Sequence, residues 1–198
     1  MKKLILASSS SYRATILRKL QLPFIIEPPK MEELEYPGES APMIAKRLSE
    51  EKAYEVALRK PDSLIIASDQ VPCLNGELLK KPGNHQTAVE QLQKCSGQTV
   101  NIYTGLCLLD SADPGNFKSL VEQFDVKFRI LSKKQIENYL RRDKPYDCAG
   151  SFKAEGLGIS LFQSLTGGDP NTLIGLPLIA LIELLQKQGV DILASEMI

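Results

Sequence analysis

Histidine is nearly missing from this chain of 198 residues, since His85 is the only one. A zinc site built from histidines is therefore excluded, and so is Ser-His-Asp or Cys-His catalysis unless His85 serves it. His85 stands near a predicted helix start, where we expect a surface residue. A bound metal would be held by carboxylates and water, which favours Mg²⁺ or Mn²⁺.

Cysteine is scarce, and long apolar runs are missing. The four cysteines share no C-x-x-C spacing, so we expect reduced and mostly buried thiols. The longest apolar stretch, residues 173–182, is interrupted by Gly175 and Pro177 and is too short to span a bilayer. The apolar run after Lys2 and Lys3 covers only residues 4–7, so we expect no export signal and a cytoplasmic protein.

The chain also has no excess of charge of either sign, because it contains 24 basic and 24 acidic residues. There is no basic stripe, so a long nucleic acid is not an expected partner. A small phosphate ligand needs only a few converging cations, which zero net charge permits. The length and a hydrophobic content of 43% fit a single domain over residues 1–198, built as two small lobes sharing a core.

Local patterns predict helices that alternate with strands. Residues 148–172 are glycine-rich, and we expect them to be irregular. Helices are predicted over residues 10–20, 40–58, 84–95, 132–142 and 177–188, and strands over 24–26, 63–67, 71–74, 77–79, 100–108 and 124–130. The pattern indicates an α/β fold with a mixed sheet, a long antiparallel hairpin in the middle and a cleft between the two halves.

The N-terminal segment combines an apolar run with four serines at residues 8–11. A strand that enters a helix through such residues presents free backbone N–H groups at the positive end of the helix dipole, which can receive a phosphate. Arg13 would add a forked cationic contact in the first helical turn. The alternative is that these serines only cap the helix.

Lys52 falls on an apolar stripe of the second predicted helix, in register with Ile44, Leu48 and Val56. A lysine on such a face either extends its ammonium group to the edge or meets an anion in a cleft, because burial without a partner is costly.

Asp69 follows the apolar run at residues 64–67, where a strand is predicted to end. Strand ends carry the ligand-binding crevice of many α/β sheets, so this carboxylate would hold a divalent cation or act as a general base. The alternative is a turn cap. Gln70 beside it would read a base or a sugar by hydrogen bonds.

Two later segments offer further polar groups. Lys80 and Lys81 follow a predicted hairpin and would contact phosphate, or would be an ordinary exposed turn. Residues 150–158 hold three glycines, which permit close approach of backbone to a ligand. Glu155 among them would read the edge of a guanine, or would be a solvated glutamate.

The order of these signals resembles the Maf family along nearly the whole chain. Besides Glu33 and Lys52, the resemblance rests on L-I-L-A-S-S-S-x-x-R from residue 4, A-S-D-Q-V from 67, K-P at 81, Y-T-G-L from 103, C-A-G-S-F-K-A-E-G from 148 and D-P-N-T-L-I-G-L-P-L from 169.

Maf proteins are nucleoside triphosphate pyrophosphatases with an elongated two-lobed α/β fold, which is related to enzymes that hydrolyse inosine triphosphate, and dimers are usual. The resemblance implies that Asp69 is the general base or a metal ligand, and that Glu33 helps to hold the divalent metal. It assigns phosphate binding to Ser8, Arg13, Lys52 and Lys81.

Three positions resemble the 7-methyl-GTP branch of the family. Gln70 and Glu155 stand where branches acting on dTTP and UTP usually have threonine and glutamine, and Tyr12 matches an aromatic position. Methylation at N7 gives guanine a positive charge, which an aromatic face can stack against. One departure is Ala14, where the family often has a second arginine.

The resemblance leaves two other functions open. One is a pyrophosphatase for UTP or dTTP, which would not need the carboxylate of Glu155. The other is a nucleotide-binding regulator of cell division or septum formation, which would bind nucleotide without metal and release no pyrophosphate.

Overall fold

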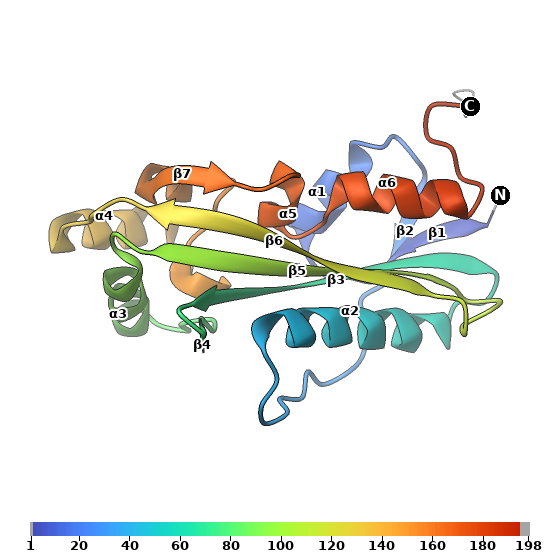
Figure 1. Ribbon diagram of the computed structural model, residues 1–198, viewed down its shortest axis with the longest axis horizontal. Helices are drawn as coiled ribbons and strands as arrows, with labels where there is room; N and C mark the ends of the chain where they lie inside the picture. Colours follow the sequence, from blue (N-terminus) through green and yellow to red (C-terminus); the bar gives the residue numbers. More distant parts are fainter. Residues whose placement is uncertain (1, 195–198) are drawn as a thin grey trace. The chain divides into compact units, whose positions relative to one another are not determined.

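The computed structural model describes residues 2–194, and within them it forms a seven-stranded mixed sheet with flanking helices (Figure 1). The strand order is β2-β1-β3-β5-β6-β7, and β4 pairs with β3. The strands are β1 (Lys3–Leu6), β2 (Phe24–Ile26), β3 (Ser63–Leu74), β4 (Glu77–Leu78), β5 (Thr99–Asp110), β6 (Lys118–Phe128) and β7 (Phe162–Thr166). The helices are α1 (Ser11–Arg18), α2 (Ala41–Ala57), α3 (His85–Cys95), α4 (Lys133–Asp143), α5 (Pro170–Ile174) and α6 (Leu178–Lys187), with short 3₁₀ helices at Ala149–Ser151 and Leu157–Leu161.

The chain divides into two compact units. The first comprises residues 2–70, 104–122 and 169–194, and the second comprises residues 71–103 and 123–168. The three long strands β3, β5 and β6 each contribute residues to both units. The predicted single domain with a cleft between two lobes stays a prediction.

In the first unit, alternate residues of the strands face two different helical layers. Leu6 and Ile66 pack with Leu17 of α1 and Leu181 of α6, while the neighbouring strand residues pack with α2 on the opposite face. Figure 1 shows this arrangement, with α2 on one side of the strands and α1 and α6 on the other. Strands β2, β1 and β3 run parallel here, which explains why β1 and β3 read as continuous apolar runs.

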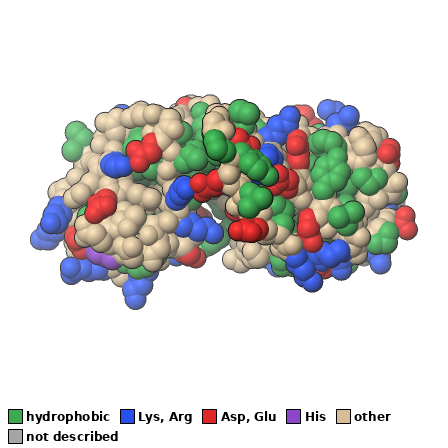
Figure 2. All heavy atoms as spheres, turned by 90° about the horizontal axis from the view of Figure 1, so that it is seen from below, with side chains coloured by type: hydrophobic (Ala, Val, Ile, Leu, Met, Phe, Trp, Pro, Cys, Tyr) green, Lys and Arg blue, Asp and Glu red, His purple; other side chains and the backbone are tan. Residues whose placement is uncertain are grey.

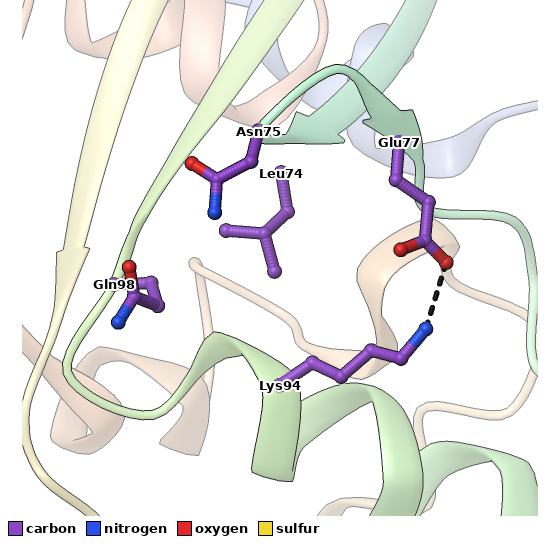
Figure 3. A pocket seen from close by; sticks show the side chains of 5 residues that line it. All are labelled: Leu74, Asn75, Glu77, Lys94 and Gln98. Atoms are coloured by element: carbon purple, nitrogen blue, oxygen red, sulfur yellow. Dashed lines mark hydrogen bonds and ion pairs between the residues drawn. The ribbon is translucent and has the colours of Figure 1, made fainter.

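In the second unit, local sequence signals set most element boundaries. Asn75 and Gly76 both have positive φ, and they form the predicted hairpin turn between β3 and β4. Ser132 and Gln135 form the predicted capping box at the start of α4. A pocket of about 400 Å³ beside this hairpin is lined by Leu74, Asn75, Glu77, Lys94 and Gln98, and it includes no predicted site residue (Figure 3).

Two predictions about local structure were wrong. The strand predicted at residues 63–67 continues to Leu74, so Asp69 lies within β3 rather than at its end. Polar residues were expected to end the strand, but their side chains find buried partners, which lets the backbone stay in the sheet. The segment 148–172, predicted as irregular, contains β7, which pairs antiparallel with β6 from Phe128 to Asp125.

The structure bears on the predictions of reduced, mostly buried cysteines and of a surface without a basic stripe. All four cysteines are free thiols, and three of them are buried. Within residues 2–194, no helix is long and apolar enough to cross a membrane. On the face drawn in Figure 2, basic side chains are interspersed with acidic ones.

Gly105 of β5 permits the close contact between the sheet and α2. A Cβ atom at this position would lie 2.1 Å from the carbonyl oxygen of Ala45. We expect Gly105→Ala to lower the free energy of unfolding by about 3 kcal/mol, because strand and helix backbones must separate. Urea denaturation followed by circular dichroism measures this. Gly115→Ala is the matched control, since its Cβ would meet nothing nearer than 3.9 Å, and an equal loss there would contradict the packing argument.

Candidate active site

The N-terminal serines follow β1 and lead into α1. Ser10 is the N-cap residue, and its hydroxyl accepts a hydrogen bond from the backbone N–H of Arg13. Ser8 is buried, and its hydroxyl oxygen accepts from the backbone N–H of Ser10 at 3.1 Å. The capping interpretation is therefore confirmed for Ser10, while Ser8 lies against the side chain of Arg13.

Arg13 is half-buried and fixed by two contacts. Its Nε donates to the carbonyl oxygen of Gly175 at 2.8 Å, and its Nη1 lies 3.4 Å from the hydroxyl oxygen of Ser8. Burial lowers the pKa of Arg13, and the negative charges of Asp69 and Glu33 oppose that shift. Arg13 therefore belongs to one electrostatic cluster with these two carboxylates.

Lys52 and Asp69 form the centre of this cluster. The Nζ of Lys52 lies 2.5 Å from Oδ1 of Asp69 and 2.6 Å from Oε1 of Glu33. Lys52 is 6% exposed and Asp69 is 8% exposed, so the ammonium is buried and meets anions rather than extending to the edge. The anions are carboxylates of the chain itself.

The pKa of Asp69 is raised, because burial penalises its charged form. The charges of Lys52 and Arg13 act in the opposite direction, and the charge of Glu33 adds to the increase. A carboxyl group with a perturbed pKa beside specific charged partners is typical of functional sites. A raised pKa also brings a carboxylate closer to the range that suits a general base at neutral pH.

The side chain of Gln70 is turned toward the protein interior. Its Nε2 lies 2.9 and 3.0 Å from the carbonyl oxygens of Thr172 and Leu173, and 3.1 Å from the hydroxyl of Thr104. Thr172 also donates to Glu122. This network could not be predicted from the sequence, because nothing local to Gln70 indicates partners on β5 and α5.

Ser68 links the same elements from the neighbouring position of β3. Its hydroxyl lies 2.7 Å from the carbonyl oxygen of Gly105 and 2.8 Å from that of Gly175. Gly175 has φ of +117°, and a Cβ atom there would come within 3.3 Å of Nε of Arg13. Glycine at this position therefore lets one carbonyl serve both Ser68 and Arg13.

The remaining predicted residues are exposed. Tyr12 lies in the first turn of α1 and is 41% exposed. Lys81 follows β4, and Glu155 lies in the turn before the 3₁₀ helix Leu157–Leu161, so both belong to the second unit. The structure thus brings together Ser8, Arg13, Glu33, Lys52 and Asp69 in the first unit, and the roles of Lys81 and Glu155 stay predictions.

The donor chemistry of this cluster fits a divalent cation. Two carboxylates, Asp69 and Glu33, converge on a single cationic group, the ammonium of Lys52. No cluster of three or more His, Cys, Asp or Glu residues suited to a metal occurs in the described part of the chain. Mg²⁺ is usually bound by one or two carboxylates together with substrate phosphates and water, so two converging carboxylates are sufficient.

The fold and this cluster define an α/β protein with a buried aspartate paired to cations beside the start of α1. The profile of the Maf family, described as Maf-like protein, matches residues 3–188, and the chain belongs to this family.

Curated relatives match nearly the whole chain. A 7-methyl-GTP pyrophosphatase of Colwellia psychrerythraea is 52% identical over 99% of this chain and 98% of its own. Proteins with the same name from Nitrosococcus oceani and Pseudoalteromonas atlantica are 51% and 54% identical, each over 96% of this chain and over 95% and 97% of their own.

Among solved structures, the chain has a partial likeness to a HAM1 protein from Coxiella burnetii, with a TM-score of 0.41 and 13% identity over 65% of this chain and 73% of that one. Another is a nucleoside-triphosphatase / dITP/XTP pyrophosphatase from Mycobacterium abscessus, with a TM-score of 0.41 and 15% identity over 65% of this chain and 75% of that one.

Removing the positive partner of Asp69 should destabilise the protein in a pH-dependent way. Lys52→Met leaves a buried carboxylate without its closest cation, which we expect to cost about 3–5 kcal/mol of unfolding free energy at about pH 8. The folded-state pKa of Asp69 is already raised and rises further in this variant, so the folded state binds more protons than the unfolded state. The loss should therefore shrink toward about pH 5.

Urea denaturation at both pH values measures this difference. The control is Lys52→Met combined with Asp69→Asn, in which the added pH dependence should vanish. A loss that is equal at both pH values would contradict the assignment of Asp69 as the uncompensated group.

Proposed function

We propose that this protein hydrolyses the bond between the α and β phosphates of a nucleoside triphosphate, and that its substrate is 7-methyl-GTP, giving 7-methyl-GMP and pyrophosphate. The observation that carries this proposal is the buried carboxylate of Asp69, which pairs with Lys52 and is also influenced by the positive charge of Arg13. This group of side chains combines a carboxylate that can act as a base or metal ligand with cations that can bind phosphate. The curated relatives that share at least 51% of its residues support the same reaction and substrate.

The charged residues of the first unit divide into two roles in this proposal. Asp69 takes the proton of the attacking water or holds the metal. Arg13, fixed by Gly175 and Ser8, and Lys52 receive phosphate oxygens and stabilise the charge that grows in the transition state. Mg²⁺ or Mn²⁺, held by Asp69 and Glu33, would neutralise phosphate charge and orient the leaving pyrophosphate.

Base selection is assigned to Tyr12, Gln70 and Glu155. Tyr12 of α1 is exposed, and in this proposal its ring stacks on the positively charged purine. Glu155 is an exposed carboxylate that would accept hydrogen bonds from the guanine edge and offset the charge of the methylated ring. The side-chain amide N–H groups of Gln70 donate to the backbone carbonyl oxygens of Thr172 and Leu173. We therefore propose that Gln70 acts through its side-chain carbonyl oxygen or by holding α5 in place.

The family resemblance also supports a cytoplasmic homodimer. It further supports Lys81 as an additional residue that contacts phosphate. Size-exclusion chromatography with light scattering tests the dimer independently of the activity.

Pyrophosphate release from 7-methyl-GTP, GTP, UTP, dTTP and CTP tests the function, with Mg²⁺ or Mn²⁺ and with a chelator. We expect metal-dependent release that is fastest with 7-methyl-GTP. Asp69→Asn should lower kcat by about 10²–10⁴-fold, because it removes the base or the metal ligand. Faster release from UTP or dTTP would retain the reaction and reject the substrate. Nucleotide binding without release from any substrate would favour a regulator instead.

Glu155→Gln tests the substrate assignment separately from the reaction. The variant keeps the shape of the side chain but loses the charge that offsets the methylated guanine. We expect kcat/KM for 7-methyl-GTP to fall by about 10–100-fold, and kcat/KM for UTP to change by less than about twofold. Ser160→Ala is the control, because Ser160 is exposed in the same region of the chain. Lys153→Met would not serve, because the ammonium of Lys153 donates to the carbonyl oxygen of Asp143 at the end of α4. An equal fall for both nucleotides would show that Glu155 does not read the base.

A further inference from the structure

The segment between β2 and α2, residues 27–40, carries Glu33 and contains no strand or helix. Glu33 is 55% exposed at its side chain, yet its carboxylate reaches the buried ammonium of Lys52 at 2.6 Å. An irregular segment has no continuous backbone ladder to fix it, so side-chain contacts must help to hold it in place. Here they come from α2 and from the turn that follows it.

Arg47 of α2 makes most of them with the part of the segment that follows Glu33. Its Nε and Nη2 donate to the two carboxylate oxygens of Glu39, each at 2.6 Å, and Nη2 also donates to the carbonyl oxygen of Leu34 at 3.0 Å. The guanidinium carbon lies 4.5 Å from the ring centroid of Tyr36. Glu51, one turn further along α2, holds the guanidinium from the other side.

This arrangement is stronger than an ordinary surface ion pair. The side chains of Arg47 and Glu39 are 19% and 12% exposed, and the contact is bidentate. Forked arginine–carboxylate pairs are stronger and more directional than single contacts, and stacking on an aromatic ring adds to them. One side chain thus binds Leu34, Tyr36 and Glu39 at once, and Leu34 is the residue next to Glu33.

The opposite end of the segment has a separate anchor. Arg59, in the turn that follows α2, donates to Glu27 and to the carbonyl oxygen of Pro28. Glu55 of α2 pairs with Arg59 and accepts from the backbone N–H of Lys30. These contacts lie before Glu33 and do not include its neighbours from Leu34 onward. The two arginines therefore allow the two ends of the segment to be tested independently.

We propose that Arg47 is a positioning residue that fixes Glu33 on Lys52, so that the carboxylates of Glu33 and Asp69 converge. This role rests on the proposed function, because only a metal-bound triphosphate would need the second carboxylate. Arg47 acts through the carbonyl oxygen of Leu34, the ring of Tyr36 and the carboxylate of Glu39.

Hydrogen exchange in the metal-free protein tests the positioning without any activity. In Arg47→Met we expect amide exchange of residues 31–36 to accelerate by about tenfold, because local opening no longer breaks the Arg47 contacts. Glu39→Gln removes the same contact from the segment side and should act in the same direction. If Arg47→Met folds poorly, Glu39→Gln carries the test alone.

Binding of Mn²⁺, followed by electron paramagnetic resonance, tests the consequence for the carboxylate pair. Arg47→Met should weaken Mn²⁺ binding by about 10–100-fold, the usual effect of losing a residue that orients a metal ligand. The metal concentration for half-maximal turnover should rise by the same factor, while kcat at saturating metal stays within about threefold. In a Glu33→Gln background, Arg47→Met should have no further effect on Mn²⁺ binding.

Arg59→Met is the matched control, since it removes an arginine that holds the same segment, but at Glu27 and Pro28, before Glu33. It should leave exchange of residues 31–36 and Mn²⁺ binding unchanged. Equal effects of the two arginine variants, or wild-type exchange and Mn²⁺ binding in Arg47→Met, would overturn the proposal. If wild-type protein releases no pyrophosphate from any nucleotide, the proposed function fails, while the exchange and Mn²⁺ measurements still decide the role of Arg47.

Discussion

The ion pair between Asp69 and Lys52 is the interaction on which the rest of the site depends. Asp69 lies inside a central strand and Lys52 on the covered face of α2, and neither charge would be tolerated there alone. Their contact at 2.5 Å makes the burial of both possible and fixes α2 against β3 at that point. The glycine at position 105 supports the same arrangement, because it lets the backbone of β5 approach α2 closely. The position of the Asp69 carboxylate is thus a consequence of how the sheet and the helix pack.

Features with local causes were predictable from the sequence. The turn at Asn75 and Gly76 needs two residues with positive φ, and the capping box of Ser132 and Gln135 needs only groups within one turn. The end of β3 was not predictable in this way. Continuing the strand past Ala67 depends on Gly105 and Gly175 accepting from Ser68, and on Lys52 pairing with Asp69. Those partners come from distant parts of the chain, so a window around residue 69 shows only polar residues and suggests a stop.

The same distinction applies to the site. The apolar register of α2 predicted that Lys52 either reaches solvent or meets an anion, and only the structure shows that Asp69 and Glu33 are the anions. Gln70 was predicted to face a ligand because it follows Asp69, but its amide group is directed at Thr172 and Leu173. Arg47 gave no signal in the sequence, since an arginine on the polar side of a helix is common. Its importance comes from the tertiary contacts that it makes with residues 34–39.

Lys52 has two competing roles, the ion pairs with Asp69 and Glu33 and the proposed contact with phosphate. The charge balance of the cluster shows how both roles can hold. In the structure its ammonium is engaged with two carboxylates, and Arg13 adds the second positive charge, so the four groups sum to zero. A triphosphate brings several negative charges to a site whose cations are already paired. Lys52 can turn to a phosphate oxygen only when Asp69 and Glu33 have another cation as their partner, because an uncompensated buried carboxylate costs more than the new contact returns. In the proposed function, phosphate binding by Lys52 and metal binding by the two carboxylates are therefore one coupled requirement, and it is met only if Glu33 stays close to Asp69.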